Sequence, residues 1–204
     1  MSSFPPSPPS SQKIPQTFGD LFGFYHTYVK ALYSDVQSED TLPLETLFEL
    51  NAALDHISRH HVYGEAEAVS VGKSYGHLKR SCFDICKIAV REARKQYDAL
   101  RRIDTSAIDN GDFDRNLIQL FSRIRKGSRD ARLNDSRPPS LEDIDAAFDA
   151  WQPVLADCMR LQTEFYENQH INWAKRRNIK RFIAAAVIGA ATAAVIGQLL
   201  QKFI

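Results

Sequence analysis

Two pairs of metal-ligating side chains stand at a spacing that suits a helix. His56 and His60 are four residues apart, and so are Cys82 and Cys86. Residues four apart lie on one face of a helix, so two neighbouring helices could offer four ligands to a tetrahedral zinc ion. The other interpretation is that Cys82 and Cys86 are small buried side chains on an apolar face. Zinc at these four residues is therefore a candidate only, and we expect no cofactor.

The signatures of common catalytic sites are missing from the sequence. It contains no nucleophile elbow, P-loop, HExxH pair or dinucleotide-binding fingerprint. None of the six histidines follows an arginine by five or seven residues, the spacing found in HEPN-type helical ribonucleases. We expect the three cysteines to be reduced thiols, because no signal peptide precedes the domain. These observations favour a protein that is not an enzyme.

Residues 182–200 form an uncharged stretch in which only Thr192 and Gln198 are polar. Taken as a helix, the stretch is roughly 28 Å long, close to the ~30 Å hydrocarbon core of a bilayer. We therefore predict a transmembrane tail at residues 182–204. The alternative is a buried, Ala-rich helix of a soluble fold, because Ala and Gly favour insertion less than Leu, Ile or Phe.

A basic segment, residues 173–181, directly precedes the tail. Its candidate lipid-headgroup and topology residues are Trp173, Lys175, Arg176, Arg177, Lys180 and Arg181. Positive residues beside a span face the cytoplasm, and each is attracted to anionic lipid by about 1 kcal/mol. The sequence thus predicts a single-pass membrane protein whose N-terminal domain is cytoplasmic.

Small residues recur every four positions along the tail. They are Ala185, Gly189, Ala193 and Gly197. Residues four apart form a narrow stripe on a helix, and small side chains there let two membrane helices approach closely. We expect the tail to self-associate through this stripe and form a homo-oligomer. The alternative is that the spacing arises by chance in an Ala-rich segment.

The remaining chain shows helical periodicity between punctuating residues. The predicted helices begin near Thr17, near Thr41, at about Glu65, at about Asp112 and at Ser140, with breaks at Tyr63-Gly64 and Asn110-Gly111. Pro153 is expected to kink or restart the last helix, and nothing after it interrupts the helical pattern.

The predicted fold is all-α. An antiparallel bundle of four or five helices occupies residues 16–172, and its long last helix continues into the C-terminal transmembrane helix. Residues 1–15, which are rich in Pro and Ser, form a disordered arm. Such a continuous last helix would transmit a rearrangement of the bundle to the tail.

Charge is distributed in blocks along the chain. Residues 1–72 carry a net charge of −6, residues 73–137 carry +7, residues 138–172 carry −6 and the remainder carries +6. The basic block contains a candidate anion-binding set, Arg91, Arg94, Lys95, Arg101 and Arg102, and a second group, Arg123, Arg125, Lys126 and Arg129. The alternative is that basic and acidic helices lie side by side and pair their exposed charges.

The sequence favours a tail-anchored membrane protein whose helical bundle recognises an unidentified protein or small-molecule signal. In one version a signal repacks the bundle, the tails assemble and the membrane is perturbed, as in a toxin or phage-defence effector. In another version the protein is a non-enzymatic membrane scaffold or adaptor. A soluble nucleotide- or nucleic-acid-binding helical domain is the third alternative, although the sequence shows little sign of a nucleic-acid partner.

Overall fold

The computed structural model of the chain describes residues 14–37, 44–106, 108–135 and 141–201. For residues 35–37, 141–143, 194, 195 and 197–201 it describes the backbone alone. Within these ranges all regular structure is helical and no strand occurs, which confirms the predicted all-α bundle. The expected arm at 1–15 lies outside the described residues as far as residue 13, whereas Ile14 packs against the core and Pro15 is buried.

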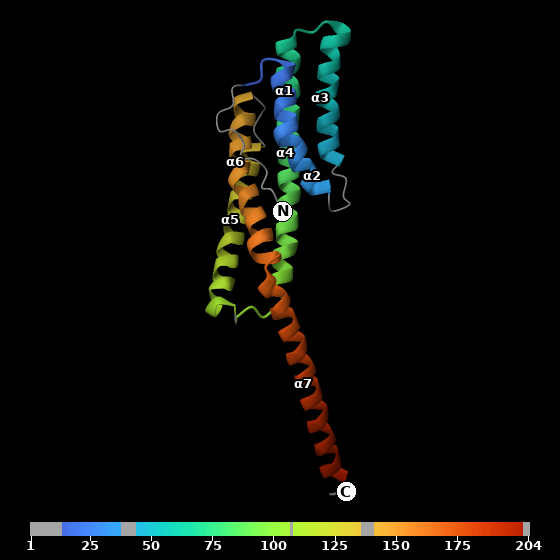
Figure 1. The fold of residues 1–204 in the computed structure, drawn as a ribbon, viewed down its shortest axis with the longest axis vertical. Helices are drawn as coiled ribbons and strands as arrows, with labels where there is room; N and C mark the ends of the chain where they lie inside the picture. Colours follow the sequence, from blue (N-terminus) through green and yellow to red (C-terminus); the bar gives the residue numbers. More distant parts are fainter. Residues whose placement is uncertain (1–13, 38–43, 107, 136–140, 202–204) are drawn as a thin grey trace.

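The helical elements follow one another with short connections (Figure 1). They are α1 (Phe18–Phe24), the π-helical segment η1 (Tyr25–Val29), α2 (Lys30–Gln37), α3 (Leu44–Tyr63), α4 (Glu67–Leu100), the 3-10 turn η2 (Asp109–Gly111), α5 (Asp112–Asp135), α6 (Leu141–Arg160), the π-helical segment η3 (Leu161–Tyr166) and α7 (Gln169–Gln201). The predicted starts at Thr41 and Ser140 lie outside the described residues.

Helix α4 is the axis of the bundle. It has 34 residues and a length of about 51 Å. Helices α1 and α3 pack along its first half, α5 packs along its second half, and α6 runs beside most of its length (Figure 1). Its buried side chains include Tyr75, Cys82 and Ile85, and they meet the fully buried Trp151 of α6 and Leu117 of α5 in one continuous core. This core forms because apolar residues recur on α4 at helical spacing on several sides.

The predicted boundaries at Thr17, Gly64 and Gly111 are confirmed. Thr17 accepts a hydrogen bond from the Asp20 amide and Asp20 bonds back to the Thr17 amide, which makes a capping box at the start of α1. Gly64 ends α3 with φ +72°, and Gly111 has φ +89° before α5. Both angles lie in the left-handed region, which glycine adopts without steric cost.

The last helix of the bundle is not one continuous rod, contrary to expectation. Helix α6 continues through Pro153 without interruption. The chain instead leaves helical structure at Glu167 and Asn168, between η3 and α7. In η3 the hydroxyl of Thr163 donates to the carbonyl of Met159 (3.0 Å). The break needs neither Pro nor Gly, so the helical pattern of the sequence did not reveal it.

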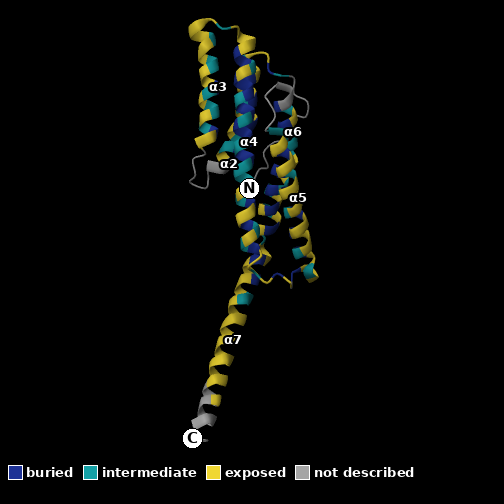
Figure 2. Ribbon diagram, turned by 180° about the vertical axis from the view of Figure 1, so that it is seen from behind, coloured by how far each residue is buried: buried dark blue, intermediate teal, exposed yellow. Residues whose placement is uncertain are grey.

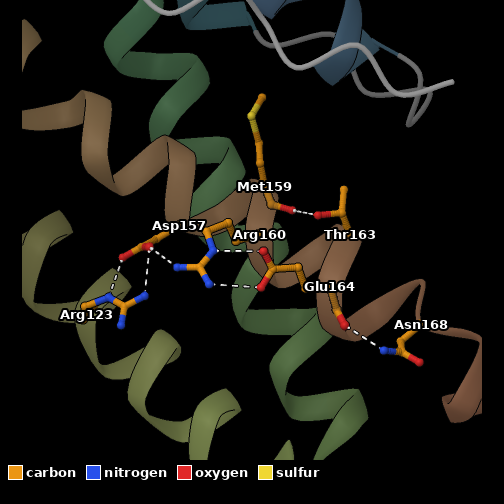
Figure 3. A network of polar contacts seen from close by, with 7 residues as sticks. All are labelled: Arg123, Asp157, Met159, Arg160, Thr163, Glu164 and Asn168. Carbon is orange, nitrogen blue, oxygen red and sulfur yellow. Dashed lines mark hydrogen bonds and ion pairs between the residues drawn. The ribbon is translucent and has the colours of Figure 1, made fainter.

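Basic and acidic helices lie side by side, as one of the two charge interpretations requires. Arg123 of α5 holds Asp157 of α6 through two hydrogen bonds of 3.0 and 3.1 Å. Arg160 binds Glu164 in the same two-bond manner, at 3.1 and 3.0 Å (Figure 3). Paired hydrogen bonds of this kind give the contact a defined geometry. The Arg123–Asp157 pair joins α5 to α6, whereas Arg160–Glu164 links neighbouring turns of one chain segment. Both pairs add little stability, because the arginines are about half exposed.

Helix α7 extends away from the bundle, and its residues are exposed along most of its length (Figure 2). Within the described part of the chain, no helix is long and apolar enough to cross a membrane. The predicted transmembrane helix is therefore not supported there. After Arg181, side chains are described for residues 182–193 and for Ile196. These residues are fewer than the ~20 that a span needs.

Candidate functional site at the basic segment and helix α7

Helix α7 begins at a joint built around Asn168. The Asn168 Nδ2 donates to the carbonyl of Glu164 (3.0 Å), and its Oδ1 accepts from the amide of His170 (2.9 Å). The side chain therefore closes η3 and caps α7 at once (Figure 3 shows the first bond). Ile171 and Ala174, each 1% exposed, are the last residues of α7 in the core. Beyond them no described residue of α7 is buried.

The basic segment forms the next two turns of α7, and its side chains are mostly exposed. Arg181 pairs with Asp104 in the loop after α4, with Nη1 and Oδ2 2.8 Å apart. Hydrogen bonds from Ser106 are the main cause of the lowered pKa of Asp104, and the charges of Arg181 and Arg177 lower it further. The basic side chains thus lie on residues 173–181, which join the bundle to the tail and form the neck of the molecule.

Two of these cations contact aromatic rings, one within the neck and one just before it in the chain. The guanidinium of Arg177 lies 5.3 Å from the ring centroid of Trp173, and Lys175 Nζ lies 6.0 Å from that of Tyr166. For Arg176 and Lys180 no ion pair occurs with any described residue. The predicted headgroup residues are therefore gathered in one band, with charge and aromatic surface both accessible.

Large apolar side chains of α7 are exposed on every side of the helix. They are Phe182, Ile183, Val187, Ile188 and Ile196. Because each residue turns a helix by about 100°, these five positions surround the axis rather than share one face. Phe182 is 76% exposed and Ile188 is 66% exposed. A helix that is apolar all round is normally covered by protein or lipid.

The small-residue stripe lies in the same exposed region. Ala185, Gly189 and Ala193 are exposed, and a Cβ added at Gly189 would meet nothing within 4 Å. The surroundings of Gly197 lie outside the described residues. Nothing in the described part of the bundle packs on this stripe, so its face is open to another helix.

The candidate anion-binding set lies toward the end of α4 and on the loop after it. All five side chains are exposed. Arg94 pairs with Asp98 (4.0 Å) and Lys95 with Glu92 (2.9 Å). Arg91, Arg101 and Arg102 form no ion pair with a described residue. Because all five side chains are exposed and two of them pair with carboxylates of the same helix, the set has the character of a solvated basic surface.

The candidate zinc ligands are not brought together. Cys82 and Cys86 face the core from α4, where burial raises the pKa of the Cys82 thiol to about 12 and that of Cys86 well above its ordinary value. His60 Nδ1 donates to the Glu65 carbonyl, 2.7 Å away. Among the described residues no group of three or more His, Cys, Asp or Glu could hold a metal ion. The helical spacing was right, but the cysteine face points inward.

One cluster was missed in the sequence because its members come from two helices. His77 of α4 and Glu49 of α3 are joined by a 2.7 Å contact between Nδ1 and Oε2, and the ring of His56 stacks on that of His77 with centroids 5.2 Å apart. These histidines line a cavity with Lys73 and Arg80. The i, i+4 spacing of Lys73 and His77 is too common a pattern to identify such a site.

Comparison with known proteins adds no family to these observations. No protein-family model, curated protein or solved structure matches the chain.

Proposed function

We propose that this protein is a non-enzymatic, membrane-attached helical bundle whose tail helix α7 enters the bilayer and self-associates there. The observation that supports the proposal is the exposure of large apolar side chains around the whole circumference of α7. Each such side chain left in water forgoes about 1.5–3 kcal/mol of burial free energy. An uncovered helix of this composition therefore favours a lipid or protein environment.

The sequence beyond the described side chains is consistent with insertion. The uncharged stretch continues through residues 194–200, where Leu199 and Leu200 add strongly apolar positions. Apart from Ile196, the structure describes only the backbone there, so the proposal rests on residue types for that part of the helix.

The basic segment sets the orientation in this proposal. Its five cations, Lys175, Arg176, Arg177, Lys180 and Arg181, precede the apolar stretch, and no cation occurs inside it. We expect the bundle on the cytoplasmic side, with the cations and Trp173 at the level of the lipid headgroups. The joint at Asn168 would then lie between the bundle and the membrane surface.

Partition of the full chain between membrane and supernatant tests the attachment. Wild type is expected in the membrane fraction after a high-salt wash and after alkaline carbonate. The double variant Val187→Lys/Ile188→Lys should leave that fraction, because each Lys costs about 2.5–3.5 kcal/mol in the middle of a span. Wild-type protein in the salt-washed supernatant would disprove the proposal.

The matched control for this variant is Val62→Lys/Tyr63→Lys. These neighbouring residues of α3 are 67% and 81% exposed, so the control adds the same charge at an equally exposed apolar pair. It should partition as wild type does. If both double variants lose the membrane fraction, added charge alone explains the result and α7 has no special role.

A membrane-potential dye then separates an effector from a scaffold. Depolarisation of cells that express wild type, but not Val187→Lys/Ile188→Lys, is expected of an effector that assembles in the membrane. An unchanged potential with full membrane attachment is expected of a scaffold. The break at Glu167 and Asn168 means that no continuous helix links the bundle to the tail, so the membrane potential is the measurement that separates the two.

A further inference from the structure

A cavity open to solvent lies between α3, α4 and the start of α6, away from the helix that the proposed membrane attachment uses. Its volume is about 350 Å³, which lies at the small end of the ~300–1,000 Å³ range of small-molecule sites. It is remote from the tail. Gly76 in the cavity wall is roughly 36 Å of helix away from Leu100, and α7 leaves the bundle just beyond that end of α4 (Figure 1).

The wall of the cavity is basic. Its polar side chains are His56, Lys73, His77 and Arg80, and none of the carboxylates whose side chains the structure describes belongs to the wall. Lys73 contacts Glu65 outside the wall at 2.6 Å. An ammonium group has three donors, so this contact leaves two of them for a ligand. The cavity therefore suits an anion far better than a cation.

Arg80 is the cation whose charge is least compensated. Its side chain is half-buried, and its nearest polar contact is 3.5 Å from Nη1 to Nδ1 of His77. No carboxylate among the described residues pairs with it. A guanidinium withdrawn from water is stabilised by a carboxylate or a phosphate, whose oxygens match its planar donors.

The two histidines are held where they can supply further hydrogen bonds. Glu49 orients His77 through Nδ1, and His77 stacks against His56. The Nδ1 atom of His56 is buried and has no hydrogen-bond partner. Burial lowers the pKa of His56, and the nearby charges of His77, Lys73 and Arg59 lower it further while Asp55 opposes them. An anion in the cavity would relieve this accumulation of positive charge.

Glycines keep one side of the cavity open. Gly72 and Gly76 lie one turn apart on α4 and both line it. A Cβ added at Gly72 would meet nothing within 4 Å, so the space above this residue is free. A glycine inside a helix weakens it by about 1 kcal/mol relative to alanine. In return for this loss of helix stability, the two glycines leave the α4 backbone accessible from the cavity.

From this geometry we infer that the cavity binds a small soluble molecule that carries a phosphate group. A phosphate ester holds close to two negative charges and three acceptor oxygens, which matches Arg80, Lys73 and the two imidazoles better than a single carboxylate does. The distance from α7 favours a soluble ligand over a lipid headgroup. The inference does not depend on whether α7 enters a membrane.

Titration of the full chain with inorganic phosphate, at constant ionic strength, tests the inference. Imidazole NMR signals of His56 and His77 should shift and saturate. Arg80→Gln should weaken phosphate binding by about tenfold or more, because it removes a charge-assisted contact. Arg115→Gln is the matched control, since Arg115 is an exposed arginine of α5 that pairs with Asp112. It should bind phosphate as wild type does.

A second pair of variants tests the cavity itself. Gly72→Leu fills it while improving helix propensity, so it should fold and lose phosphate binding. Gly23→Leu adds the same side chain at an exposed helical glycine in α1 and should bind normally. Equal affinity in wild type, Arg80→Gln and Gly72→Leu would overturn the inference.

Vesicles of phosphatidylcholine with phosphatidic acid distinguish the lipid source. Arg80-dependent binding to these vesicles without saturable binding of inorganic phosphate would replace the soluble ligand by a headgroup and so overturn the inference. Normal phosphate binding by Val187→Lys/Ile188→Lys would support it, and would show that the cavity and the tail act independently.

Discussion

The two tryptophans of the chain lie in its two contrasting regions. Trp151 on α6 is 0% exposed in the bundle core, whereas Trp173 at the start of α7 is 51% exposed. The bundle buries its apolar residues against several helices, but beyond Ala174 α7 buries none of its described apolar residues. The same residue class is therefore a source of fold stability in one region and an available binding surface in the other.

Truncating each tryptophan should give the largest difference between the regions. Trp151→Ala is expected to lower the free energy of unfolding by about 3–5 kcal/mol, since it leaves a cavity in a close-packed core. Trp173→Ala should change it by less than about 0.5 kcal/mol. Urea unfolding followed by circular dichroism measures both. A comparable loss from Trp173→Ala would mean that α7 packs on the bundle more tightly than described.

Glycine substitutions should separate stability from assembly. A Cβ at Gly127 of α5 would lie 2.8 Å from Cγ2 of Val154 on α6, while one at Gly189 would meet nothing. Gly127→Val should therefore cost about 1–3 kcal/mol of unfolding free energy through overpacking. It should leave chemical cross-linking of membrane-bound protein unchanged.

Gly189→Leu should show the opposite behaviour. Its unfolding free energy should stay close to that of wild type, and cross-linked oligomers should decrease because the bulky side chain separates the helices. Unchanged cross-linking by Gly189→Leu would remove the self-association part of the proposal. It would leave membrane attachment to be judged by partition.

The joint between the regions should show a smaller effect. Asn168→Ala removes the side chain that closes η3 and caps α7, and we expect a loss of about 1 kcal/mol. Amide hydrogen exchange in the first turn of α7 should become faster. Asn178→Ala, inside α7, is the control and should not accelerate it. An unchanged exchange rate in Asn168→Ala would show that Ile171 and Ala174 hold this turn without the cap.

A pH effect confined to the bundle is the smallest expected change. The pKa of His56 is lowered from 6.5 in the folded state, mainly by burial. The unfolded chain therefore binds the proton more readily, so this group makes stability fall as the pH drops below about 6.5. Urea midpoints at pH 7.5 and 5.5 should differ less in His56→Gln than in wild type. An equal difference would mean that other groups govern the pH dependence.

Features that depend on adjacent residues were predictable. The Thr17–Asp20 capping box, the end of α3 at Gly64 and the turn at Asn110–Gly111 each follow from side-chain or glycine chemistry over a few residues. The break at Asn168 was not predictable, because asparagine and glutamate also occur inside helices. It becomes a break only through the hydrogen bonds of Asn168 to both neighbouring elements.

The candidate sites divide in the same way. The basic segment and the apolar stretch are each contiguous in sequence, so each could be located from the sequence alone. In the structure the basic segment lies where α7 leaves the bundle. The cavity could not be foreseen, since it joins His56 of α3 to Lys73, His77 and Arg80 of α4. The candidate zinc ligands, which the sequence offered only beside the alternative of buried cysteines, do not come together for a related reason: spacing specifies a shared helix face but not what that face meets.

By itself, the sequence determined the all-α class, the local helix ends and the contrast between a charged bundle and an uncharged tail, because periodicity, capping and composition act over short distances. Tertiary packing alone decided that Cys82 and Cys86 face the core, that Arg80 has no carboxylate partner among the described residues, and that α7 departs from the bundle at Asn168. Each of these depends on which helices become neighbours, and that choice is made by the burial of side chains far apart in the chain.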